Sequence, residues 1–141
     1  MTLQKTFDNP AAVPPPAGHF SHVVRLGLGG DAALLFVSGQ VALDADGRVV
    51  GPGDMRAQAR HVMESLRAVL AAHGGTLADV VNIRSFVTDM GLLAEYAEVR
   101  RGYFPGPPPS STTVEVSRLF RDGALLEVEV VAAVTGGGQG A

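Results

Sequence analysis

The feature of this sequence that most constrains the fold is a pair of strand-like runs near the C-terminus, residues 111–116 and 125–134. A turn that contains Arg121, Asp122 and Gly123 separates the two runs. Apolar and polar residues alternate along both, which is the pattern of strands that bury one face of a sheet. We therefore expect two strands of one sheet, with helices covering its apolar face.

The alternation also divides the side chains of these runs between two predicted faces. The apolar face takes Thr112, Val114, Val116, Leu126, Val128, Val130 and Ala132. The opposite face takes Ser111, Thr113, Glu115, Glu127 and Glu129. Ionised side chains at the centre of a strand usually have a partner or a function, because an isolated buried charge is costly. The polar face is therefore where we expect the chemistry.

Hydrophobic periodicity predicts the remaining elements upstream. The predicted strands cover residues 21–28, 33–41 and 80–88, and the predicted helices cover residues 54–73 and 89–103. Asp54 is a suitable N-cap for the first helix. Two helices are enough to cover one face of a mixed sheet of about four to six strands, which gives an α+β two-layer sandwich.

The second face of this predicted sheet would be only half polar. Phe86, Leu125 and Val131 fall beside the glutamates and threonines in the alternation. A partly apolar face left in water is typical of an interface. We therefore expect an oligomer whose subunits cover each other's sheets.

Length and charge narrow the class of protein. The chain has 141 residues, a net charge of −3 and only 11 basic residues, which argues against binding to nucleic acid, ribonuclease action and binding to an anionic membrane. The absence of cysteine excludes a disulfide framework and thiol catalysis. No continuous apolar segment opens the chain, and Lys5 is the only lysine in a sequence rich in Ala and Gly, so we expect a cytoplasmic bacterial protein.

The domain organisation follows from the prolines and glycines at the two ends. Pro10 and the run Pro14–Pro16 favour an extended arm, without regular elements, over residues 1–18. Residues 19–134 then form one domain, and residues 135–141 form a glycine-rich tail that we expect to be flexible.

Metal and acyl-enzyme chemistry find little support in the residue spacing. His19 and His22 stand three apart, with no third ligand evident, so we expect no metal site. No His or Lys lies near Ser111, Thr112 or Thr113 in the sequence to activate a hydroxyl nucleophile. These three residues are better suited to donating hydrogen bonds.

Several motifs resemble the Rid (YjgF/YER057c/UK114) family, whose best-known members hydrolyse reactive imines and enamines to carbonyl compounds. The motifs are Phe36–Val41 (FVSGQV), Gln58–Arg60, Phe86–Asp89, Thr113–Leu119 and Glu127–Ala132. The resemblance implies a chorismate-mutase-like α+β subunit, a homotrimer and a small-molecule cleft at each subunit interface, with no cofactor.

The resemblance also assigns roles to individual positions. It implies that Glu127 positions or activates water, and that Ser38, Gly39 and the loop from Pro109 to Thr113 contact the substrate. Phe20 stands where the family has a cleft tyrosine, and Ala97 stands where it often has asparagine.

One further departure concerns the substrate. Ser111 occupies the position at which the imine-hydrolysing members carry an arginine that binds the substrate carboxylate. Without it, a 2-imino acid would bring its carboxylate near Glu127 uncompensated, so we expect a neutral imine, enamine or carbonyl compound. Glu127 would act as the base, while the hydroxyls of Ser111, Thr112 or Thr113 hold an oxygen.

Three alternatives remain open from the sequence. The protein could be a non-catalytic trimer that binds a small molecule or regulates a partner. Glu127 and Glu129 could be interface carboxylates neutralised by Arg84 or Arg118. Finally, Arg100 or Arg101 either replaces the missing arginine from another direction or belongs to a solvated helix face.

Overall fold

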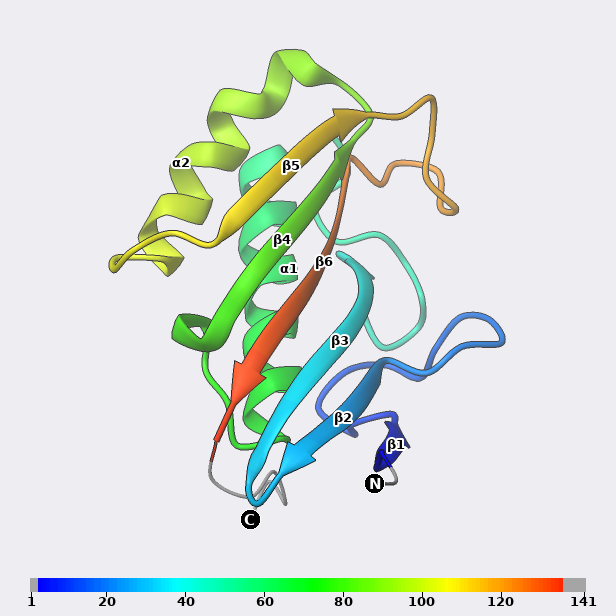
Figure 1. Cartoon of the computed structure of the whole chain (residues 1–141). Helices are drawn as coiled ribbons and strands as arrows, with labels where there is room; N and C mark the ends of the chain where they lie inside the picture. Colours follow the sequence, from blue (N-terminus) through cyan, green and yellow to red (C-terminus); the bar gives the residue numbers. More distant parts are fainter. Residues whose placement is uncertain (1–2, 136–141) are drawn as a thin grey trace.

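The computed structural model describes residues 3–135 and contains one mixed sheet (Figure 1). Its strands are β1 (Lys5–Asp8), β2 (Val23–Gly29), β3 (Ala32–Val41), β4 (Val80–Val87), β5 (Ser110–Glu115) and β6 (Leu126–Val134). They lie in the order β1-β2-β3-β6-β4-β5, so that β1 and β5 form the two edges. β4 and β5 are parallel, and every other neighbouring pair is antiparallel.

Two helices, α1 (Met55–Ala71) and α2 (Leu93–Tyr103), cover the same face of this sheet (Figure 1). Short 3-10 turns at Leu77–Asp79 and Met90–Leu92 introduce β4 and α2 respectively. The α+β two-layer sandwich with two helices on one face is therefore confirmed, and the opposite face of the sheet is uncovered in the single chain.

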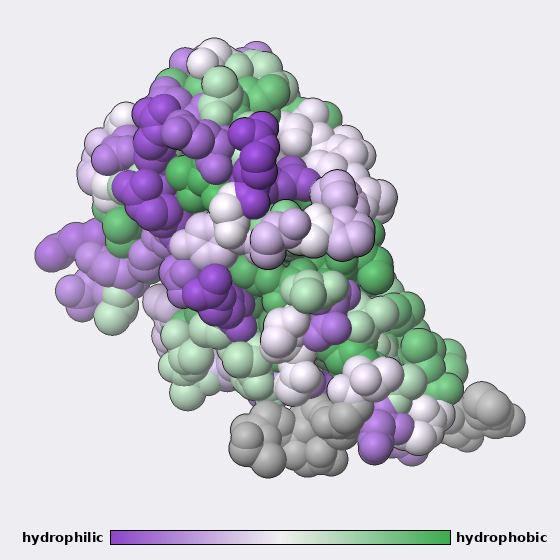
Figure 2. All heavy atoms as spheres, turned by 90° about the vertical axis from the view of Figure 1, so that its left-hand side faces the viewer, coloured by the Kyte–Doolittle hydropathy of each residue, from purple (hydrophilic) through white to green (hydrophobic). Residues whose placement is uncertain are grey.

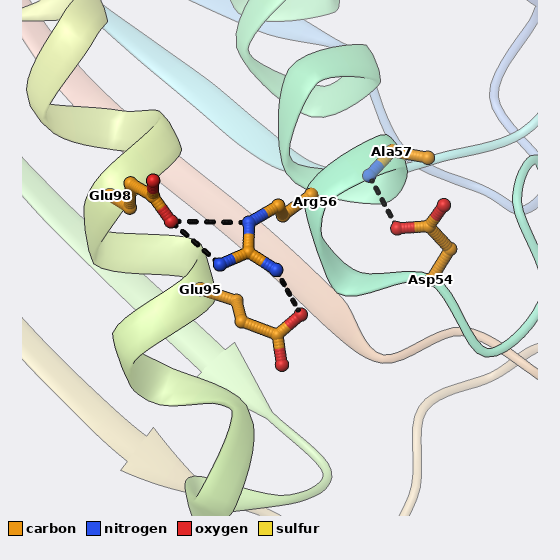
Figure 3. Close-up of polar contacts among 5 residues, drawn as sticks. All are labelled: Asp54, Arg56, Ala57, Glu95 and Glu98. Carbon is orange, nitrogen blue, oxygen red and sulfur yellow. Dashed lines mark hydrogen bonds and ion pairs between the residues drawn. The ribbon is translucent and has the colours of Figure 1, made fainter.

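The first helix begins where the sequence predicts. The Asp54 carboxylate accepts a hydrogen bond from the Ala57 backbone N–H at 3.0 Å, which satisfies one of the free donors of the first turn (Figure 3). Gly74, with φ of 74°, adopts the left-handed conformation just beyond the end of the helix. The face that α1 buries consists of Met55, Gln58, Ala59, Val62, Met63, Leu66, Val69 and Leu70.

Arg56 joins the two helices by ion pairs (Figure 3). Its guanidinium lies 2.9 Å from the Glu95 carboxylate and 2.7 Å from the Glu98 carboxylate, both of which belong to α2. The hydrogen bond from Arg56 lowers the pKa of Glu98. As a result, both acidic side chains of α2 are engaged by α1.

Gln58 is a fully buried amide that connects α1 to two loops. Its Nε2 donates to the carbonyls of Gly51 and Gly123 at 3.1 and 2.9 Å, and its Oε1 accepts from the Leu125 N–H at 2.8 Å. Because Gly123 and Leu125 lie immediately before β6, Gln58 helps to fix the strand that carries Glu127.

The N-terminal segment differs from the predicted arm. Residues 1–18 were expected to contain no regular element, yet Lys5–Asp8 form an edge strand that pairs with β2, with Lys5 opposite Leu26. The nearly buried His73, just beyond α1, anchors this strand, because its Nε2 lies 2.8 Å from the Asp8 carboxylate. This long-range contact has no local sequence signal. The predicted tail falls largely on residues 136–141, outside the described residues.

The predicted faces are correct for β6 but wrong for β5. Leu126, Val128, Val130 and Ala132 are buried under the helices, as expected. In β5, however, the parallel register sets Ser111 beside Ile83 and Thr113 beside Ser85, and both of these β4 residues are buried. Ser111 and Thr113 therefore lie on the helix-covered face, and Thr112 and Val114 lie on the open face.

Replacing Gln58 by leucine tests its structural role. We expect a loss of unfolding free energy on the order of 3 kcal/mol, because the Leu125 N–H and two loop carbonyls lose their partner. Urea unfolding followed by circular dichroism measures this change. Arg60→Leu, at an exposed position of the same helix, is the control and should change stability by less than about 0.5 kcal/mol. Equal effects of the two substitutions would contradict the role of Gln58.

Candidate functional site

Glu127 lies in a cavity of about 260 Å³, which we call the Glu127 cavity. Its walls come from the N-terminal segment, the end of β3, α1 and the loop before β6. The residues that the argument uses are Pro14, Phe20, His22, Ser38, Gly39, Gln40 and Glu127. The structure thus gathers four predicted site residues, namely Phe20, Ser38, Gly39 and Glu127, around one space.

The Glu127 carboxylate is partly buried and stands between Val41 of β3 and Phe86 of β4 in the sheet register. Burial raises its pKa, and the nearby Glu129 carboxylate raises the pKa further. Within the described part of the chain, neither Arg84 nor Arg118 forms an ion pair with either glutamate. Burial without a neighbouring cation destabilises the ionised form of Glu127 relative to the protonated form. Glu127 is therefore suited to exchange a proton closer to neutral pH than an exposed glutamate.

Gly39 makes room for this carboxylate. A β-carbon added at Gly39 would lie 1.9 Å from the Glu127 Oε2, far closer than two such atoms approach each other. Gly39 belongs to the irregular step of β3 between Val37 and Gln40, where the register against β6 shifts. The irregularity and the missing side chain together allow the carboxylate to rest against the β3 backbone.

His22 and Gln40 hold the N-terminal segment over the cavity. The Gln40 amide nitrogen donates to His22 Nδ1 at 3.1 Å and to the Ser38 carbonyl at 3.0 Å. His22 Nδ1 therefore accepts, and His22 Nε2 donates to the Pro14 carbonyl at 2.7 Å. Sequence reasoning considered His22 only as a metal ligand and did not include Gln40 in the site, because the pair forms only when β2 and β3 come together.

Phe20 and Ser38 complete this part of the site. Phe20 is 46% exposed and packs edge-on against the His22 ring, with centroids 5.9 Å apart. The Ser38 hydroxyl donates to the Ser21 carbonyl at 2.7 Å. Ser38 therefore fixes the start of β2 with its hydroxyl and borders the cavity at the same time.

The hydroxyl residues of β5 do not reach Glu127 within one chain. Thr113 lies on the helix side and borders a second cavity of about 400 Å³, which we call the α2 cavity. Ser111 faces the same side. Thr112 lies on the open face, opposite Arg84 in the strand register, and Arg84 lies opposite Glu129 without forming an ion pair with it. Within a single described chain, these hydroxyls therefore do not lie in the same cavity as Glu127, contrary to the expectation from the sequence.

The α2 cavity also contains the arginines that the sequence left undecided. Its lining includes Arg100, Arg101, Tyr96, Phe104, Pro109 and Thr113. Ala97 lines it too. Arg100 and Arg101 therefore border a cavity distinct from that of Glu127.

Two features are absent from the part of the chain that the structure describes. Residues 3–135 contain no helix that is both long and apolar enough to cross a bilayer. In the same span, His, Cys, Asp and Glu form no group of three that is arranged to hold a metal ion.

Gly39→Ala tests the contact between the glycine and the carboxylate. The added methyl group must displace Glu127, so we expect the pKa of this residue to change, together with a stability loss of about 1–3 kcal/mol. Carboxyl carbon NMR titration reads the pKa directly. Gly102→Ala is the matched control, because a β-carbon there meets nothing within 4 Å. An unaltered Glu127 titration in Gly39→Ala would refute the contact.

The raised pKa of Glu127 predicts a pH-dependent stability difference between wild type and Glu127→Gln. In the unfolded chain the Glu127 carboxyl loses its proton near pH 4.5, whereas in the folded protein it keeps the proton to a higher pH. Between these two pKa values the free energy of unfolding therefore falls as the pH rises. We expect Glu127→Gln to gain stability relative to wild type at about pH 7 but not at about pH 4. Urea unfolding at both pH values measures this, and an identical difference at both would contradict it. Glu129→Gln should lower the pKa of Glu127 only in part, because burial remains.

Comparison with known proteins agrees with this fold. The sequence profile of the family described as endoribonuclease L-PSP matches residues 11–134. The chain is 41% identical to the protein DfrA of Myxococcus xanthus over 119 residues, which cover 84% of this chain and 88% of that protein.

Two solved structures superpose along nearly the whole chain. The Rid-family protein YyfA from Yersinia pestis is 32% identical, with a TM-score of 0.82 over 93% of this chain and 100% of that one. TdcF of E. coli with bound serine is 26% identical, with a TM-score of 0.80 over 92% and 99% of the two chains. The chain therefore belongs to the Rid (YjgF/UK114) family.

Proposed function

We propose that the protein hydrolyses a small imine or enamine, or transforms a related carbonyl compound, with Glu127 as the group that transfers the proton. The observation that carries the proposal is the carboxylate itself, which is partly buried, has a raised pKa and is directed into a cavity. A carboxyl group with a raised pKa works as acid and base closer to neutral pH.

The reaction would proceed in two stages. The Glu127 carboxylate accepts a proton from water as the water oxygen bonds to the imine carbon, and it passes this proton to the imine nitrogen, which gives a neutral carbinolamine. The carboxylate then takes the proton of the carbinolamine hydroxyl as the C=O bond forms and the C–N bond breaks. Glu127 gives this second proton to the leaving amine, so that the residue ends the cycle as it began.

The lining of the Glu127 cavity favours a neutral reacting group. Among the described residues that border it, none is a lysine or an arginine. A carboxylate placed next to Glu127 would therefore meet no compensating cation. This agrees with the serine at position 111 and argues against a standard 2-imino acid as substrate.

The proposal includes a homotrimer with the site at the subunit interface. Glu127 and Thr113 border different cavities in one chain, so a site that uses both needs two subunits. The uncovered sheet face provides an apolar surface for such contacts, with Phe7 65% and Phe36 44% exposed. In this arrangement Ser111, Thr112 and Thr113 of one subunit would approach the Glu127 cavity of the next.

The second candidate function is non-catalytic binding of a small metabolite. The solved structure of TdcF holds serine, an amino acid, as a bound molecule. A structural neighbour with a bound amino acid makes a binding role a genuine alternative for this chain. By contrast, the ribonuclease activity named in the family description is disfavoured by the net charge of −3.

Glu127→Gln distinguishes these functions. Small neutral imines and enamines generated in solution are incubated with the protein, and the released amine and carbonyl compound are measured. We expect turnover by wild type and a loss of about a hundredfold or more in Glu127→Gln, because the substitution removes the base. Glu129→Gln, two residues further along the strand, should retain most of the activity.

The possible outcomes separate the two candidates. Unchanged turnover in Glu127→Gln would disprove the assignment of the base. A compound that raises the melting temperature and is recovered unaltered supports binding without catalysis, since a ligand that binds only the folded state stabilises it by mass action.

A further inference from the structure

We infer that the Glu127 cavity selects a small organic cation, such as an iminium or ammonium group, through the Glu127 carboxylate and the rings of Phe20 and Phe120. All three side chains border the same space of about 260 Å³. The inference deepens the proposed function: the substrate class rests on that proposal, whereas the binding of a cation does not.

The first observation is the charge of this cavity. Among the described residues that line it, Glu127 is the one with a formal charge. Burial and the neighbouring Glu129 carboxylate both raise the pKa of Glu127, so both disfavour its ionised form. An organic cation in the cavity would relieve both effects, because opposite charges at close range stabilise each other.

The positive charges of the helical layer do not reach this cavity. Figure 2, which looks onto the left-hand side of Figure 1, shows hydrophilic residues gathered over the upper part of that side. The arginines of α1 and α2 are Arg56, Arg60, Arg67, Arg100 and Arg101. None of them is among the described residues that border the Glu127 cavity. Within one subunit, a positive charge next to Glu127 must therefore come from a ligand.

The second observation is that two accessible phenylalanine rings border the cavity. Phe20 is 46% exposed and Phe120 is 54% exposed, although large apolar side chains are more often buried. The face of an aromatic ring carries partial negative charge and attracts a cation. The absence of a cation in the lining excludes an anionic reacting group, and the rings go further, because they favour a positive group over a neutral one.

Phe20 and His22 are held by contacts with the rest of the chain. A β-carbon added at Gly18 would lie 3.5 Å from the Phe20 ring, so the backbone at Gly18 supports that ring. His22 borders the cavity with both ring nitrogens already engaged, by the Gln40 amide and by the Pro14 carbonyl. His22 therefore presents no free N–H group that could bind an anion.

Phe120 already contacts one cation of the chain. The guanidinium carbon of Arg121 lies 5.1 Å from the centroid of the Phe120 ring. Arg121 is not among the residues that line the cavity, so its guanidinium contacts the ring from outside. Because Arg121 is exposed, water and salt screen its charge, and it opposes a cation in the cavity only weakly. A role limited to packing against Arg121 would not require Phe120 to border the cavity.

The size and lining of the cavity define the class of ligand. A space of about 260 Å³ accommodates a small molecule, and Pro14, Val41 and Leu43 supply apolar surface. A compact cation with apolar substituents and no carboxylate satisfies these features. In the proposed reaction, an imine that binds a proton becomes an iminium ion. Hydrolysis then follows the same two stages with one additional proton, and the amine leaves as an ammonium ion.

Choline and its uncharged isostere 3,3-dimethylbutan-1-ol test this preference. The two molecules have nearly the same shape, only choline is charged, and neither contains a C=N bond that could be hydrolysed. Both are titrated into the full-length protein at neutral pH, with affinity measured by calorimetry and the site mapped by NMR chemical shifts. We expect choline to bind about tenfold or more tightly and to perturb Phe20, Gly39 and Phe120.

Substitutions at position 120 separate the ring from its bulk. Phe120→Leu keeps apolar surface but removes the ring, so choline affinity should fall about threefold to tenfold, with the affinity of the uncharged isostere within about twofold of wild type. Phe120→Tyr is the matched control, because it retains an aromatic ring, and should keep choline affinity within about twofold.

Substitutions of the two glutamates test the carboxylate. Glu127→Gln should reduce the affinity for choline to about that for the uncharged isostere, because no charge remains in the lining. Glu129→Gln removes the same charge from a residue that does not border the cavity, and should weaken choline binding by less than about threefold. Circular dichroism checks the folding of all four variants.

Three results would overturn the inference: equal binding of choline and its isostere, equal losses in Phe120→Leu and Phe120→Tyr, or shifts confined to the residues of the α2 cavity. Equal binding is the result expected if an arginine of a neighbouring subunit already compensates Glu127. If a variant does not fold, the choline preference and the shift map of wild type decide the question. The proposed function fails separately, through unchanged turnover in Glu127→Gln, because choline binding is measured without any reaction.

Discussion

The uncompensated burial of the Glu127 carboxylate is the constraint around which the site is built. A charge withdrawn from water without a cation is unfavourable, and the fold tolerates it by placing the group against a bare stretch of backbone at Gly39. The irregular step in β3 supplies that stretch, and Gln58 supports β6 from behind through the loop that precedes it. The position of the Glu127 side chain therefore depends on the irregular step in β3, on Gly39 and on the buried amide of Gln58.

The two cavities of one subunit differ in the charged groups that line them. The Glu127 cavity contains a carboxylate and, among the described residues, no lysine or arginine, whereas the α2 cavity contains Arg100 and Arg101 and no carboxylate. Neither Glu95 nor Glu98 borders the α2 cavity, and Arg56 of α1 forms ion pairs with both of them.

Much of the fold was predictable because its elements have strong local patterns. The stripe of α1, its cap at Asp54 and the buried face of β6 all appear where periodicity places them. β5 shows the limit of this reasoning. Alternation reveals that neighbours point to opposite sides but not which side is covered, and Val114 suggested the wrong one because the open face is apolar as well. Contacts such as His22 with Gln40 or His73 with Asp8 join distant segments and have no local signature.

The link between His22 and Pro14 has a consequence for how this protein can vary. His22 forms a hydrogen bond with the main-chain carbonyl of Pro14, and the proline ring takes no part in that bond. Because every amino acid has this carbonyl, the side chain at position 14 can change without loss of the hydrogen bond. Substitutions in the N-terminal segment would change the surface of the Glu127 cavity and leave the hydrogen bonds of His22 to the main chain and to Gln40 in place.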